Sequence, residues 1–257
     1  MTVIEIVGLA LAAAAGGAVN AVAGGGTLIT FPMLLYFGID SKIANATSTL
    51  ALVFGTSGSI FGYRRHIEPV KSWLWSFLPA SVIGGFVGSL LLTRTDSGTF
   101  SRLVPFLILF ATILFLAQGP MRRLLKFGKL GGAVQPQTLW AAIAFQFIVS
   151  VYGGYFGAGI GILMLAALGF IGLQNIFEMN TLKTILGSVI NLVAAVWFIY
   201  VGLIDWPRAG VMTFGAVAGY FLGAHYSQQI APAKVRLIIT AIGFILSAMT
   251  FYQQFLK

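Results

Sequence analysis

The sequence predicts an all-α protein, a polytopic bundle of membrane helices built from two homologous halves. First, 58% of the residues are hydrophobic and only 8% are charged, against roughly 25% charged in a soluble domain. Second, most apolar segments reach the ~20 residues that a helix needs to cross a bilayer. Third, the second half repeats the order of features in the first. A soluble fold of this length could not bury so much apolar surface, whereas lipid solvates it.

Ten apolar segments follow one another along the chain. They cover residues 3–22, 27–37, 43–63, 72–92, 100–117, 138–156, 160–171, 179–201, 209–226 and 235–255. The segments 27–37 and 160–171 are too short to span, and each follows a full-length segment after a glycine cluster, Gly24-Gly25-Gly26 or Gly157-Ala158-Gly159-Ile160-Gly161. Each half therefore has a glycine-broken or re-entrant helix, the pattern of a transporter with its site at the breaks.

Composition excludes several function classes. The chain has no cysteine, so disulfides, thiolate catalysis and cysteine metal sites are excluded. The two histidines, His66 and His225, fall in different halves, which disfavours zinc or haem, and we expect no cofactor. The net charge of +9 is spread between apolar segments rather than over one face, as in a multispanning protein. We therefore expect membrane lipid and no nucleic acid as a partner.

The first segment carries Glu5 and no basic residue, so it lacks the positive region of a signal peptide, and we expect a retained helix. A shift of 134 residues lays Gly25 on Gly159, and a shift of 135 lays Gly84 on Gly219. We predict a first membrane repeat at 1–118, a linker at 119–136 and a second repeat at 137–257. The linker holds four cations and no acid, which predicts a cytoplasmic location.

The orientation of the halves depends on whether each glycine break is a kink within one crossing or a turn that returns to its starting side. Both arrangements put nine Lys and Arg residues inside and five outside. The positive-inside rule therefore leaves parallel and inverted repeats open, and with them the side of both termini.

Several stretches resemble the TauE/SafE family of sulfite and organosulfonate exporters. They are Gly24-Gly25-Gly26-Thr27-Leu28-Ile29-Thr30-Phe31-Pro32, Gly153-Gly154-Tyr155-Phe156-Gly157-Ala158-Gly159-Ile160-Gly161 and Asn180-Thr181-Leu182-Lys183. The resemblance covers essentially the whole chain. It implies a permease of the cytoplasmic membrane for a small inorganic or organic anion, such as sulfite or sulfoacetate, without fixing which anion. One departure is Ala166, where many members have a proline matching Pro32.

The glycine clusters are the first candidate binding residues. A helix that begins inside the membrane offers unpaired N–H groups and the positive end of its dipole, which suit an anion. The candidates at the two helix starts are Gly25, Gly26, Thr27, Gly159, Ile160 and Gly161. The alternative is that these glycines only allow close helix packing, which is favoured for Gly84, Gly88, Gly219 and Gly223.

Lys183 is the most informative single residue, because a lysine at mid-membrane costs ~2.5–3.5 kcal/mol and calls for a partner. A transported anion or Glu178 would serve, and the alternative is a lysine that snorkels to the interface. The matched position is Thr49. Further candidates for a polar path are Thr47, Ser48, Asn180, Thr181 and Asn191, whose alternative role is hydrogen bonding between helices.

The leading hypothesis is a secondary transporter or facilitator of a small sulfur-containing anion. A membrane scaffold or assembly protein and a lipid-modifying enzyme are the alternatives. We expect no enzyme, since none of the six acids lies centrally in a span. We expect Glu68 and Asp205 to be solvated loop acids, and Arg64, Arg65 and His66 to set topology. The anion, the direction, the coupling ion and the choice between monomer and homodimer stay open.

Overall fold

The computed structural model describes residues 1–22, 25–63, 67–125, 136–170, 173, 176–226 and 232–256. Over these residues the chain is helical and contains no strand, which confirms the all-α prediction. The helices are α1 (Val3–Val22), α2 (Thr27–Tyr36), α3 (Ser41–Tyr63), η2 (Glu68–Val70), α4 (Lys71–Arg94), α5 (Ser97–Leu125), α6 (Pro136–Tyr155), α7 (Ile160–Phe170), α8 (Ile176–Tyr200), α9 (Trp206–Tyr226) and α10 (Pro232–Phe255).

Six of the described helices are long and apolar enough to cross a membrane, so the chain is a multi-pass membrane protein. Large apolar side chains such as Leu11, Phe214 and Phe221 cover the outside of the bundle, as lipid contact requires. The predicted linker at 119–136 is helical at its start, because α5 continues to Leu125. Several features of the sequence lie outside the described residues, namely Gly24, Arg64, Arg65, His66 and residues 126–135 of the predicted linker.

Local chemistry explains where several helices begin and end. Asp40, Asp96 and Asp205 accept hydrogen bonds from backbone N–H groups in the first turns of α3, α5 and α9, as N-cap residues do. Gly38 ends α2 in the left-handed conformation, at φ 78°, and closes the turn with a bond to Leu35 O. Three of the six acids are therefore used to start helices.

Both glycine breaks are reversals of direction. A Cβ on Gly8 of α1 would touch Met33 and Phe37, and one on Gly16 would touch Gly26 and Thr30, so α1 and α2 run antiparallel. Ala142 near the start of α6 and Ala167 near the end of α7 line one pocket, whereas Gly153 near the end of α6 meets Ile160 at the start of α7. The kinked alternative is therefore not found, and each short helix returns towards the end at which its predecessor began.

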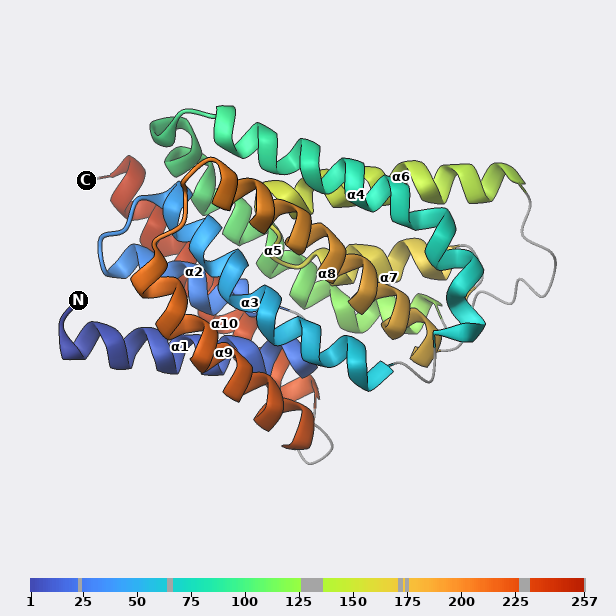
Figure 1. Ribbon diagram of the computed structural model, residues 1–257, viewed down its shortest axis with the longest axis horizontal. Coiled ribbons are helices and arrows are strands. Elements are labelled where there is room, and N and C mark those ends of the chain that lie inside the picture. The colour runs from blue at the N-terminus through green and yellow to red at the C-terminus, as the bar shows by residue number, and fades with distance from the viewer. Residues whose placement is uncertain are drawn as a thin grey trace.

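The long helices pack in pairs that join the predicted halves. Helix α1 packs on α9 and α6 on α4, while α3 packs on α9 and α8 on α4; α3 also meets α8, and α5 meets α10. Both termini lie at one end of the bundle, at the left of Figure 1, and α6 begins at the opposite end. Two halves of opposite orientation would give this pattern, and the repeat itself stays a prediction.

Small residues bring the α1–α9 and α4–α6 pairs into close contact. A Cβ on Gly219 would lie 1.9 Å from Ala14 O, and a Cβ on Gly88 would lie 2.0 Å from Val151 O. Gly84 and Gly223 are similarly close to α6 and α1. The interpretation of these four glycines as packing residues is confirmed.

Candidate functional site

A cavity of about 90 Å³ lies between the two helix reversals and is bordered by α3, α8 and α9. This volume accommodates a few water molecules or a small oxyanion. It is lined by Asn20, Ala21, Gly25, Thr27, Thr49, Leu52, Thr56, Phe156, Gly157, Gly159, Ile160, Gly161, Met164, Lys183, Thr184, Gly187, Ser188, Asn191 and Tyr220. The cavity brings together seven of the predicted binding residues, namely Gly25, Thr27, Gly159, Ile160, Gly161, Lys183 and Asn191.

The other five predicted residues lie away from this lining. Thr47 Oγ1 accepts a hydrogen bond from Asp205 N at 3.1 Å, and Ser48 Oγ pairs with Thr30 Oγ1 at 2.6 Å. Both therefore bond neighbouring segments, because Thr49, Leu52 and Thr56 occupy the face of α3 that meets the cavity. Gly26 packs against Gly16 O, and Asn180 and Thr181 are half-buried and buried outside the lining.

Two N–H groups at the start of α2 are bonded by a side chain that sequence reasoning missed. Asn20 Oδ1 accepts hydrogen bonds from Gly25 N at 2.8 Å and from Gly26 N at 3.3 Å. Asn20 Nδ2 donates to Tyr220 Oη on α9. The signal in the sequence was an asparagine shortly before a glycine cluster, since asparagine is a favoured capping residue.

The start of α7 is built differently. Gly157 and Gly159 have φ of 82° and 80°, a conformation that glycine adopts without steric cost, and the chain turns sharply there. Tyr152 Oη donates to Ala158 O at 2.8 Å, which fixes the turn from behind. Within the described part of the chain, the N–H groups of Ile160 and Gly161 have no acceptor. These donors lie at the positive end of an 11-residue helix and border the cavity.

Two side chains of α8 complete the polar wall. A Cβ on Gly161 would lie 3.1 Å from Lys183 Cδ, so the stem of Lys183 rests on the first turn of α7. Ser188 is 6% exposed, and its Oγ has no hydrogen-bond partner in the described structure. A buried polar atom without a partner is rare in native proteins and calls for a ligand or water. Ser188 carries no distinctive sequence signal, because small polar residues in membrane helices usually serve packing.

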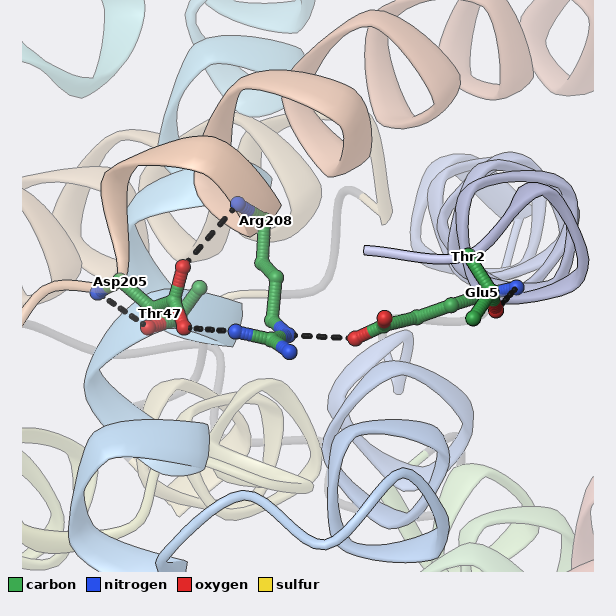
Figure 2. Close-up of polar contacts among 5 residues, drawn as sticks. All are labelled: Thr2, Glu5, Thr47, Asp205 and Arg208. Atoms are coloured by element: carbon green, nitrogen blue, oxygen red, sulfur yellow. Dashed lines mark hydrogen bonds and ion pairs between the residues drawn. The ribbon is translucent and has the colours of Figure 1, made fainter.

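A second polar cluster lies towards the end of the bundle that holds the termini. Figure 2 shows Arg208 of α9 between two carboxylates. Its Nε donates to Glu5 Oε1 of α1 at 2.6 Å, and its Nη1 donates to Asp205 Oδ2. The side chains of Arg208, Glu5 and Asp205 are 22%, 9% and 17% exposed. Through Asp205 N the cluster also reaches Thr47 of α3.

The expectation of a solvated Asp205 is therefore wrong, because Asp205 caps α9 and its carboxylate, 17% exposed, pairs with Arg208 in the first turn of that helix. The same expectation is confirmed for Glu68, whose side chain is 82% exposed and pairs with Lys71 at 3.5 Å.

Comparison with known proteins gives the family. The model of the family described as "Sulfite exporter TauE/SafE" matches residues 9–250. A "Probable membrane transporter protein" of Haemophilus influenzae is 29% identical, over 92% of this chain and 90% of the relative. "Probable membrane transporter protein ORF9" of Sinorhizobium sp is 27% identical, over 93% and 88%. "Probable membrane transporter protein YfcA" of Escherichia coli strain K12 is 25% identical, over 92% and 86%.

No solved structure gives a significant match. The family match spans nearly the whole chain, including both helix reversals and every residue of the cavity lining. The chain therefore belongs to the TauE/SafE family and is a membrane transporter.

Proposed function

We propose that the chain is a secondary transporter or facilitator of a small sulfur-containing anion, such as sulfite or sulfoacetate, and that the anion binds in the cavity between the two helix reversals. The description of the matching family supports the sulfur anion. The main support for this site is that one cavity is lined by the N–H donors at the start of α7, by Lys183, whose stem rests on that first turn, and by the unpartnered Ser188 Oγ.

The charge of the lining suits an anion. Among the described residues that border the cavity, Lys183 is the one cation and there is no acid. Thr27, Thr184 and Asn191 add hydroxyl and amide donors. A scaffold protein would need the dry glycine contacts of α1–α9 and α4–α6 but no polar cavity at the breaks. The transporter role therefore accounts for more of the structure, and it requires no catalytic step.

Passage across the membrane requires that this cavity open to each side in turn. Towards the end that holds the termini, Phe31 of α2 packs edge to face on Phe156 with ring centroids 5.4 Å apart, and both rings are buried. The Glu5–Arg208–Asp205 cluster adds a polar contact between α1 and α9 nearer that end. If the linker at 119–136 is cytoplasmic, both termini lie outside, and these two layers close the outer path.

Lys183→Gln tests the site in proteoliposomes that report uptake of labelled sulfite, sulfoacetate, thiosulfate or sulfate. Loss of a charge-assisted hydrogen bond costs about 1.5–3 kcal/mol, so the half-saturating concentration rises roughly 10- to 150-fold. Lys71→Gln, at an exposed lysine outside the cavity, is the matched control and leaves it unchanged. Wild-type protein that moves none of these anions would refute the transport role, and an unchanged Lys183→Gln variant would refute the site.

A further inference from the structure

The two helices that begin at the cavity, α2 and α7, differ in how the N–H groups at their starts are bonded. At α2 the N–H groups of Gly25 and Gly26 are both taken by Asn20 Oδ1. At α7 the N–H groups of Ile160 and Gly161 have no acceptor within the described residues. An amide oxygen between two N–H groups at a helix start has the geometry of a bound anion oxygen. Asn20 therefore does at α2 what a ligand would do at α7.

Matched positions in the two halves explain the difference. The shift of 134 residues lays Asn20 on Gly154, and the shift of 135 lays Tyr220 on Gly85. Each pair is in contact: Asn20 Nδ2 donates to Tyr220 Oη, whereas a Cβ on Gly154 would lie 2.1 Å from Gly85 O. In the second half the backbones meet directly and no side chain fits. The position matched to Asn20 therefore carries no side chain that could act as Asn20 does.

A second observation marks the α7 end as the place of the ligand. Ser188, 6% exposed, lines the same cavity with an unpartnered Oγ, and the Lys183 stem rests on Gly161. At the α2 end Asn20 already takes two of the N–H donors, Gly25 N and Gly26 N, and bonds Tyr220, so only the N–H of Thr27 is left without an acceptor among the described residues. The start of α7 is therefore the more open of the two helix ends that face the cavity.

We propose that the anion binds through a single oxyanion head group at the N-terminus of α7, and that Asn20 is a specificity-determining residue that occupies the α2 pole in place of a second head group. This inference rests on the proposed transport function. It assigns the substrate class as anions with one sulfur oxyanion head, and it excludes anions with two such heads, the disulfonates. Removal of the Asn20 amide opens a second positive pole, whereas a carboxylate at this position repels the ligand.

Two variants test the assignment in the flux assay, with sulfite and methanesulfonate as single-headed probes and methanedisulfonate as the two-headed probe. Asn20→Asp keeps the size and the acceptor but adds a charge, so the half-saturating concentration of both single-headed probes rises roughly tenfold or more. Asn20→Ala frees the N–H groups of Gly25 and Gly26, so it lowers this concentration roughly two- to fivefold and lets methanedisulfonate compete.

Gln137→Glu is the matched control, because it makes the same amide-to-acid change at an exposed residue outside the cavity. Thermal unfolding of each variant separates a binding effect from misfolding, and Asn20→Asp, which keeps the cap, carries the test if Asn20→Ala fails to fold. Equal half-saturating concentrations for wild type and Asn20→Asp overturn the inference and leave the transport role standing. Weaker binding in a folded Asn20→Ala variant also overturns it, since Asn20 would then bind the ligand itself. Absence of flux in the wild type overturns both.

Discussion

Arg208→Met should destabilise the protein strongly, because it leaves two carboxylates facing each other inside the bundle. Arg208 now donates to Glu5 and to Asp205, whose side chains are 9% and 17% exposed. Removing one partner of a buried ion pair costs about 3–5 kcal/mol. Arg208 itself is 22% exposed, so we expect the lower end, about 3 kcal/mol.

The assay is thermal unfolding in detergent micelles, followed by intrinsic tryptophan fluorescence. A change of about 3 kcal/mol lowers the apparent melting temperature by roughly 6–12 °C in a protein of this size. Lys71→Met is the matched control, because Lys71 and Glu68 form the same i,i+3 pair at 58% and 82% exposure. An exposed pair contributes only about 0–1 kcal/mol, so this variant should melt within a few degrees of the wild type.

The reasoning also predicts a rescue. Combining Arg208→Met with Glu5→Gln and Asp205→Asn removes the uncompensated charges and should recover at least half of the lost stability. Equal melting temperatures for Arg208→Met and Lys71→Met would refute the view that burial gives the cluster its strength. A rescue variant no more stable than Arg208→Met would show that the packing of the arginine stem, rather than charge, is lost.

Two glycine substitutions follow from the packing and the backbone. Gly219→Ala places a Cβ 1.9 Å from Ala14 O, which forces α1 away from α9 and should lower the free energy of unfolding by about 1–3 kcal/mol. Gly210→Ala is the control on the same helix, because the space around Gly210 is open, and this variant should be as stable as the wild type or slightly more stable in the melting assay. A Gly219→Ala variant as stable as Gly210→Ala would contradict the close contact. Gly159 has space for a methyl group, but its φ of 80° strains any residue with a side chain, so Gly159→Ala should lower the free energy of unfolding by about 1–2 kcal/mol. By shifting the start of α7 it should also raise the half-saturating anion concentration. Unchanged flux and stability would mean that this turn does not position the site.

The sequence by itself determined the class of the protein and the places where its helices break. Because charged residues are scarce and the apolar segments are long, the chain could not fold as a soluble protein. The glycine clusters marked the starts of α2 and α7, which lie at Thr27 and Ile160, as predicted. Seven of twelve candidate residues meet in one cavity, and five of them do so because they are adjacent at the two helix starts. The other two, Lys183 and Asn191, lie inside α8 and reach the cavity through helix packing.

Only the tertiary structure decided which way the chain turns at each break, because a glycine cluster permits a kink as readily as a reversal and the charge counts were equal. It also decided the partners of Asn20 and Arg208, since Tyr220 lies 200 residues from Asn20 and Glu5 lies 203 residues from Arg208. Contacts at such separations depend on how the α1–α9 pair is aligned. That alignment is set by close packing between the helices: the sequence marked Gly219 and Gly223 as packing residues but not which helix packs on them.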